Sequence, residues 1–119
     1  MSYDIDIVDP ITKQVLVVDD AHHIRGGTYC LGGTNELSLN ITYNYGKFFY
    51  DIIDKEEGIR FLYGKEAVDC IPILDKAIAA LGDDVDEDYW KPTEGNAKAA
   101  LIGLRALCKM RPDGILSGD

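Results

Sequence analysis

Apolar and polar residues alternate at the start of the chain, which predicts β-structure there. In Tyr3–Ile7 every second residue is apolar and the residues between are aspartates, the pattern of a half-buried strand. The turn-forming residues 9–13 and the β-branched run 14–18 follow. We therefore expect a hairpin in which 14–18 is the return strand.

The clearest strand pattern covers residues 36–45. One face of this strand would carry the apolar side chains of Leu37, Leu39, Ile41, Tyr43 and Tyr45. The other face would carry the uncharged polar side chains of Ser38, Asn40, Thr42 and Asn44. The preceding segment contains two Gly-Gly-Thr steps, and it predicts either tight turns around a short strand at 28–31 or an ordered loop.

The remainder of the chain has the spacing of helices. Apolar pairs at i and i+4 predict a short helix over 47–53, and longer apolar stripes predict helices over 65–81 and 94–110. Pro72 either belongs to the first turn of its helix or kinks that helix. Residues 115–117 predict one more edge strand.

Strands that precede helices along a chain of 119 residues indicate the α+β class. We expect a single domain, 1–119, in which a small antiparallel sheet from the N-terminal half packs against two to three helices from the C-terminal half. No apolar run reaches the ~18 residues of a membrane helix, and the first residues do not resemble a secretory signal. We therefore expect a cytoplasmic protein with no membrane partner.

The chain is acidic, with 12 basic and 21 acidic residues and a formal net charge of −9. Such a charge disfavours direct binding to nucleic acid or to an anionic membrane. The three cysteines, Cys30, Cys70 and Cys108, are widely spaced, which argues against a disulfide framework or a zinc knuckle. We expect three reduced, mostly buried thiols.

The most acidic segment, Asp83–Asp88, has a carboxylate at every position except that of Val85. Its alternating aspartates match the first three positions of a calcium loop. Tyr89, however, stands where that loop needs glycine, and Gly95 where it needs glutamate. We interpret the segment as a solvated acidic loop and expect no bound metal.

Other catalytic or metal-binding patterns are weak in this sequence. His22 and His23 are adjacent, so in a strand their side chains point to opposite faces and would not share one metal ion. The sequence contains neither a nucleophile elbow nor a phosphate-binding glycine motif. It predicts no catalytic residue and no cofactor, although carboxylates could still assemble in space, so enzymatic activity stays an open question.

The richest polar constellation combines the glycine-rich segment with the strand at 36–45. Its candidate ligand-binding residues are Arg25, Asn40, Thr42, Asn44 and Lys47. Amides and hydroxyls recognise donors and acceptors, and the two cations can bind phosphate. We predict a site for a small polar, nucleotide-like ligand here. The alternative is that the Asn and Thr side chains cap turns and satisfy sheet edges.

Trp90, the only tryptophan, precedes the last predicted helix and is a further candidate ligand-binding residue. Pro92 keeps the residue before it out of the helix, and either Thr93 or Asn96 can cap the helix. The free N–H groups at such a helix start favour an anion. The alternative is that Trp90 packs against the start of the helix.

Four segments of the sequence, His23–Tyr29, Asn40–Tyr45, Leu62–Lys65 and Trp90–Ala97, resemble a family of small proteins encoded in phages and prophages of gut bacteria. The likeness covers nearly the whole chain. It implies a viral accessory protein made in the host bacterial cytoplasm. It carries over no catalytic residue, because the family has no settled activity.

The sequence and the resemblance together lead to one main expectation about function. This is a non-enzymatic phage accessory protein that binds a small polar ligand or a host protein and counteracts a bacterial defence. One alternative is an anti-CRISPR-like acidic inhibitor that covers the nucleic-acid site of a host enzyme, and another is a small hydrolase. Assembly into a homo-oligomer is also open.

Overall fold

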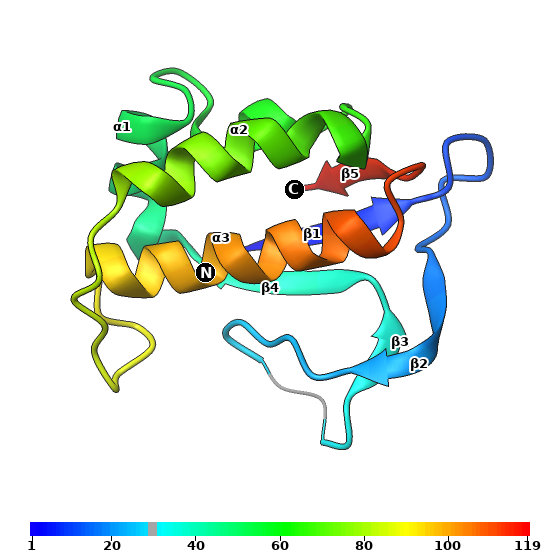
Figure 1. Cartoon of the computed structure of the whole chain (residues 1–119), viewed down its shortest axis with the longest axis horizontal. Coiled ribbons are helices and arrows are strands. Elements are labelled where there is room, and N and C mark those ends of the chain that lie inside the picture. Colours follow the sequence, from blue (N-terminus) through cyan, green and yellow to red (C-terminus); the bar gives the residue numbers. More distant parts are fainter. Residues whose placement is uncertain (29–30) are drawn as a thin grey trace.

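The computed structural model describes residues 1–28 and 31–119, and Figure 1 shows their arrangement. In chain order the elements, with η for a 3-10 helix, are β1 (Ser2–Val8), β2 (Val17–His22), β3 (Thr34–Glu36), β4 (Ser38–Thr42), η1 (Tyr43–Tyr45), α1 (Gly46–Ile52), η2 (Gly58–Leu62), α2 (Ala67–Ala80), α3 (Glu94–Met110) and β5 (Ile115–Gly118). Cys30 lies outside the described residues, and so does part of the short strand considered at 28–31.

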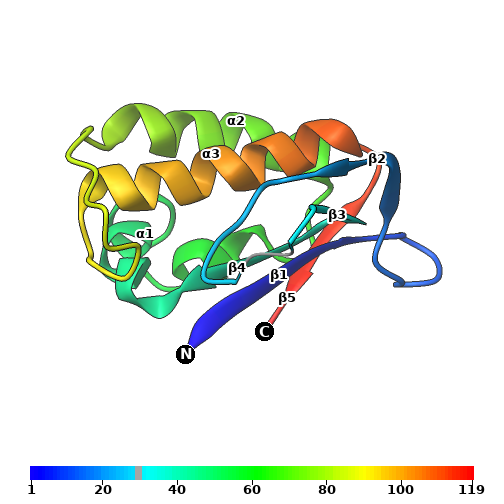
Figure 2. The same ribbon diagram turned by 90° about the horizontal axis from the view of Figure 1, so that it is seen from below.

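A three-stranded antiparallel sheet in the order β4-β1-β5 forms one layer of the fold. Ile5 lies opposite Leu39, and Ile7 lies opposite Leu116. These side chains belong to the same buried core as Leu104 of α3, and α2 and α3 lie together over one face of the sheet (Figure 2). The predicted α+β class, with a small antiparallel sheet packed against helices, is confirmed.

The hairpin predicted for the start of the chain is confirmed only beside its turn. There Val8 and Val15 form an isolated antiparallel bridge, and Leu16 N donates a hydrogen bond to Ile7 O at 2.9 Å. β4 pairs with Ser2–Asp6 of β1, and β5 pairs with Ile5–Val8 on the other edge. Most of β1 is therefore paired with β4 and β5 and is not available to residues 14–18. β2 instead forms a separate two-stranded sheet with β3.

The strand predicted at 36–45 is shorter than expected. Leu37 separates β3 from β4, and β4 ends at Thr42. The Thr42 hydroxyl accepts a hydrogen bond from Asn44 N at 3.2 Å and so caps η1. The predicted alternation of buried and less buried side chains holds in β4 until its last residue. Asn44 lies in η1 and does not continue the polar face of the strand.

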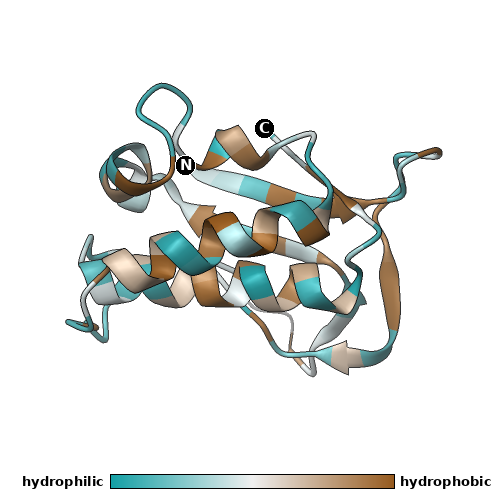
Figure 3. Ribbon diagram, turned by 45° about the horizontal axis from the view of Figure 1, so that its top comes forward, coloured by the Kyte–Doolittle hydropathy of each residue, from teal (hydrophilic) through white to brown (hydrophobic). Residues whose placement is uncertain are grey.

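The helices agree well with their predicted ranges, and the predicted edge strand at 115–117 is present as β5. Pro72 lies in the second turn of α2, so the placement in the first turn is wrong. Hydrophobic and hydrophilic residues are interleaved along α2 and α3 (Figure 3), and the buried face of α3 includes Leu104 and Leu107, both 0% exposed. In the described ranges no helix is long and apolar enough to cross a bilayer.

Cys70 of α2 and Cys108 of α3 are free thiols within the buried core. Burial raises the pKa of the Cys70 thiol to about 11 and that of the Cys108 thiol to about 12, from an ordinary value of 9.0. The reason is that a thiolate loses its hydration in the apolar core. Both thiols therefore stay protonated at neutral pH.

We expect the free energy of unfolding to fall as the pH rises above 9.0, because thiols of the unfolded chain then lose protons that the folded chain keeps up to about pH 11 or 12. Each thiol contributes a slope of at most about 1.4 kcal/mol per pH unit. Urea unfolding at several pH values measures this loss. The double variant Cys70→Ala/Cys108→Ala should lose less stability over the same range, and an equal loss in both proteins would contradict the assignment.

Candidate functional site

A glycine-rich segment, Arg25–Thr28, lies beside β4, and we call it the glycine loop. Gly27 N donates a hydrogen bond to Asn40 O of β4 at 2.9 Å. A Cβ atom on Gly26 would lie 1.5 Å from the same carbonyl oxygen, so only glycine allows the two backbones to approach this closely. Ile24, just before the loop, packs against the hydrophobic core. The chain is therefore attached to the rest of the fold on both sides of Arg25, by Ile24 before it and by the two glycines after it.

Tyr89 and Trp90 line a hollow together with the glycine loop. The Tyr89 hydroxyl donates to Asn40 O at 3.3 Å and accepts from Thr42 N at 3.1 Å, so one phenol binds the backbone of β4 twice. The Tyr45 hydroxyl in turn donates to Tyr89 O. These contacts fix the aromatic wall relative to the strand that also binds the glycine loop.

Trp90 is half-exposed at 48%, although it is a large aromatic side chain. Its ring packs edge-on against Tyr89, with the ring centroids 4.9 Å apart and an interplanar angle of 84°. A Cβ atom on Gly27 would lie 2.9 Å from Trp90 Cη2 and 2.6 Å from Asn40 Oδ1. Gly27 therefore lets the indole and the Asn40 amide pack closely against the loop, where any larger residue would clash with both.

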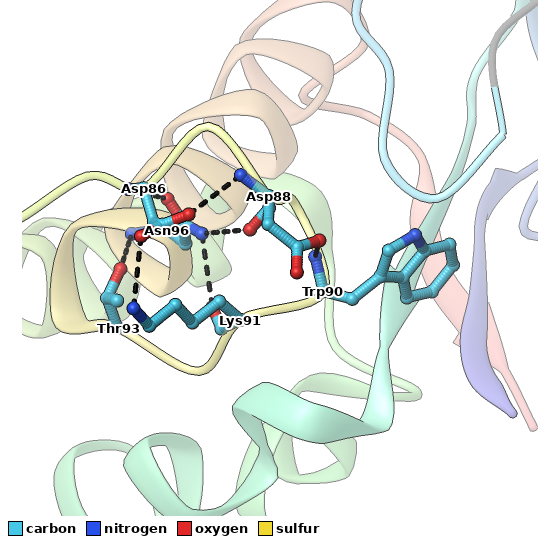
Figure 4. A network of polar contacts seen from close by, with 6 residues as sticks. All are labelled: Asp86, Asp88, Trp90, Lys91, Thr93 and Asn96. Carbon is cyan, nitrogen blue, oxygen red and sulfur yellow. Dashed lines mark hydrogen bonds and ion pairs between the residues drawn. The ribbon is translucent and has the colours of Figure 1, made fainter.

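A buried asparagine, Asn96, organises the loop that carries Trp90 (Figure 4). Its Oδ1 accepts a hydrogen bond from Asp86 N at 2.9 Å, and its Nδ2 donates to Asp88 O at 3.0 Å and to Lys91 O at 3.1 Å. Its backbone N–H donates to the hydroxyl of Thr93, the N-cap of α3, at 3.1 Å. One side chain thus holds three separate points of this loop.

The Trp90 backbone is fixed on both sides of its Cα atom. Trp90 N donates to Asp88 Oδ1 at 3.1 Å, and Trp90 O accepts from Asn44 Nδ2 at 2.8 Å. Figure 4 shows the indole projecting away from the network around Asn96. The backbone that carries the indole is therefore fixed, and the ring itself packs against Tyr89 and Gly27.

Several of the acidic residues 83–88 bind groups at or just before the start of α3. Asp84 Oδ1 accepts from Gly95 N at 3.0 Å in the first turn of the helix. Asp83 pairs with Lys98 at 2.7 Å, and Asp86 pairs with Lys91 at 3.2 Å. These contacts give the loop a structural role. In residues 1–28 and 31–119, no three His, Cys, Asp or Glu side chains are grouped so that they could hold a metal ion.

The two histidines lie in different environments. His22 is buried, and its Nε2 lies 2.7 Å from Glu36 O while its Nδ1 accepts a hydrogen bond from Ile24 N at 3.2 Å. This arrangement fits a neutral ring with its proton on Nε2, which ties β2 to β3 and to the start of the glycine loop. His23 is exposed.

Two small hollows meet at Arg25 and Tyr89, which line both of them. The glycine-loop hollow has a volume of about 250 Å³ and is lined by Arg25, Gly26, Gly27, Thr28, Tyr89 and Trp90. The helix-side hollow has a volume of about 170 Å³ and is lined by Arg25, Tyr45, Asp86, Glu87, Tyr89, Asn96, Ala99 and Ala100. Among the described residues that line these hollows, Arg25 is the only cation, and Asp86 and Glu87 are the carboxylates.

A wider cleft of about 350 Å³ lies over the polar face of β1 and β4. Its wall includes the carboxylates of Asp4, Asp6 and Glu36, and no Lys or Arg is present among its described lining residues. Ser38 Oγ donates to Asp6 at 2.6 Å, and Asn40 Nδ2 donates to Asp4. The polar side chains of this face therefore bind one another, and the negative charge of the cleft disfavours a phosphate.

The structure separates the candidate residues into two groups. Arg25 and Trp90 line one hollow, whereas Asn40 lines the acidic cleft and its amide donates to Ser2 and Asp4 across the sheet. Thr42 is buried and caps η1, and Asn44 binds the Trp90 backbone, so these two side chains form the local contacts that the alternative described. Lys47 lies on α1 with its Nζ 5.0 Å from the centroid of the Phe48 ring and lines neither hollow.

Sequence reasoning did not select Tyr89 and Glu87 as site residues, although both lie within three positions of Trp90. The adjacent aromatic pair Tyr89–Trp90 was a visible signal, because two neighbouring aromatic residues before a proline often form a packed platform. No sequence signal could place Glu87, because its position beside Arg25 depends on how the loop closes over α3.

Comparison with known proteins finds no matching family model, no similar curated protein and no similar solved structure. The resemblance to phage-encoded proteins therefore stays a prediction, and the functional argument rests on the geometry of this chain.

Proposed function

We propose that this protein is a non-enzymatic binding protein that takes a small polar ligand in the glycine-loop hollow. The observation that carries the proposal is the half-exposed Trp90, whose indole lies beside Gly27 and lines one hollow together with Arg25 and Thr28. An exposed indole that is already ordered offers a stacking surface at little entropic cost.

The residues that line the glycine-loop hollow can recognise a polar ligand. Arg25 supplies guanidinium donors, and Thr28 supplies a hydroxyl group that can donate or accept. Trp90 supplies an apolar face for a ring. Sites of this kind combine an aromatic surface with a few polar groups that fix the orientation of the ligand.

The same wall supports binding in preference to catalysis. The titratable side chains among its described residues are Arg25 and Tyr89. Burial raises the pKa of the Tyr89 hydroxyl above its ordinary value, so this group stays protonated at neutral pH. Neither residue is a general base poised near neutral pH, which acid–base catalysis requires.

The biological setting that we propose follows from the resemblance stated above. The protein would act as a phage accessory protein in the host bacterial cytoplasm, where it sequesters its ligand and so weakens a bacterial defence. The acidic-inhibitor alternative depends on carboxylates 83–88 contacting a partner, and three of them already have partners within this chain. Asp83 and Asp84 bind Lys98 and Gly95 of α3, and Asp86 binds Lys91 in the loop before it. We therefore favour the small-ligand proposal.

Titration of Trp90 fluorescence tests this proposal directly, because Trp90 is the only tryptophan of the chain. We use adenosine, uridine, their monophosphates and glucose as probes, with calorimetry as the second readout. Loss of Arg25 contacts in the Arg25→Ala variant should cost about 1–3 kcal/mol, or about 5- to 150-fold in affinity, for a probe that binds.

Lys47→Ala is the matched control, because it also removes one exposed cation but lies on α1 and lines neither hollow. It should leave the affinity within about twofold of the original protein, a change of less than about 0.5 kcal/mol. Equal losses in the two variants would indicate a general charge effect and contradict the proposed site. The absence of any response to every probe would contradict the proposal itself.

A further inference from the structure

We propose that the ligand is an uncharged nucleoside, whose base stacks on Trp90 and whose ribose hydroxyl groups bind Glu87. This inference rests on the proposed function, because it names the ligand class for the same site. It narrows the expected nucleotide-like ligand to a molecule without a phosphate.

The two hollows are neighbours, because Arg25 and Tyr89 line both of them. A ligand that spans these two side chains would reach from the glycine loop toward α3. Each hollow alone is small, at about 250 Å³ and about 170 Å³. A two-part molecule, with a ring at one end and a polar group at the other, matches this shape better than one compact ring.

The aromatic part of the wall suits a flat ring. The glycine-loop hollow is lined by glycine backbone, by the rings of Tyr89 and Trp90 and by the side chains of Arg25 and Thr28. Trp90 already lies close against Gly27, so a ligand ring would stack on the exposed part of the half-exposed indole. Nucleobases stack well on tryptophan, and this stacking tolerates different bases.

The charges of the helix-side hollow also favour an uncharged ligand. Among its described lining residues there are two carboxylates, Asp86 and Glu87, and one cation, Arg25. The Asp86 carboxylate is already engaged by Lys91 Nζ at 3.2 Å and by Asp88 N at 2.8 Å, whereas Glu87 is exposed. A carboxylate accepts hydrogen bonds from a ribose diol and repels a phosphate, as it does in dinucleotide-binding sites. The net charge of −9 adds to this repulsion.

Titration calorimetry and Trp90 fluorescence with adenosine, adenosine monophosphate and glucose test the inference. We expect adenosine to bind at least about tenfold more tightly than the monophosphate, which corresponds to about 1.4 kcal/mol. Glu87→Gln keeps the shape of the side chain and removes its charge. It should therefore weaken the binding of adenosine and reduce the difference in affinity between adenosine and the monophosphate. Glu56→Gln, an exposed glutamate in the segment between α1 and η2, should change neither affinity.

The possible outcomes separate this inference from the proposed function. Tighter binding of the monophosphate than of adenosine, or a preference that Glu87→Gln does not alter, would overturn the nucleoside inference and leave a polar-ligand site at Trp90. Binding of glucose, without binding of adenosine or the monophosphate, would also overturn the nucleoside inference and leave the polar-ligand site. If neither nucleosides, nucleotides nor glucose alter Trp90 fluorescence or give heat, the proposed function fails as well.

Discussion

Leu104→Ala should lower the free energy of unfolding by about 2–5 kcal/mol, because it opens a cavity in a closely packed core. Leu104 is 0% exposed and lies on the face of α3 that packs in the core shared by the sheet and α2. Few neighbouring side chains can move into the space that the missing atoms leave. Urea unfolding followed by circular dichroism measures the loss.

Ile102→Ala is the control for this prediction, because Ile102 lies on the same helix and is 49% exposed. It should cost less than about 1 kcal/mol, since little apolar surface is buried there. A loss below about 1 kcal/mol for Leu104→Ala itself would mean that this face of α3 is not part of the packed core.

Asn96→Ala should destabilise the protein by about 1–3 kcal/mol or more and also change the emission of Trp90. The substitution leaves Asp86 N, Asp88 O and Lys91 O without the side chain that binds them. The loop between α2 and α3 would then lose its fixed shape. Thermal unfolding and the position of the Trp90 emission maximum report the two effects separately.

Asn35→Ala provides the comparison. Asn35 Nδ2 also donates to two backbone carbonyl groups, Val18 O and Asp19 O, but it lies in β3 and is exposed. Its loss should leave the Trp90 emission unchanged. If Asn96→Ala has no larger effect on emission than Asn35→Ala, then Asn96 does not position the indole.

Local signals in the sequence predict the range of an element correctly where that element is stabilised mainly by its own residues. α3 begins after Thr93, which caps it, and ends before Pro112, so its predicted range agrees with the structure. The strand at 36–45 was overextended, because the Thr42 hydroxyl favours a 3-10 turn over a further extended residue. The first hairpin is limited to the bridge beside its turn because β4 and β5 occupy the two edges of β1, which no local pattern reveals.

The candidate site likewise contains residues that the sequence could predict and residues that it could not. Arg25 and Trp90 were selected for their chemistry, and they do line one hollow although they lie far apart in the sequence. Lys47 is predicted as a cation that binds phosphate beyond the end of the strand, but the structure places it on α1, where it lines neither hollow. The role of Asn96 depends on backbone groups of a loop that the sequence marked only as acidic, so it could not be predicted.

Amide chemical shifts of isotope-labelled protein, titrated with adenosine, test most directly whether the hollow between the glycine loop and Trp90 binds a ligand. We expect the largest shift changes at the Trp90 indole N–H and at the amides of Arg25–Thr28, and we expect their loss in Arg25→Ala. Changes centred instead on Asp4, Asp6 and Glu36 in the acidic cleft, or no changes at all, would contradict this expectation.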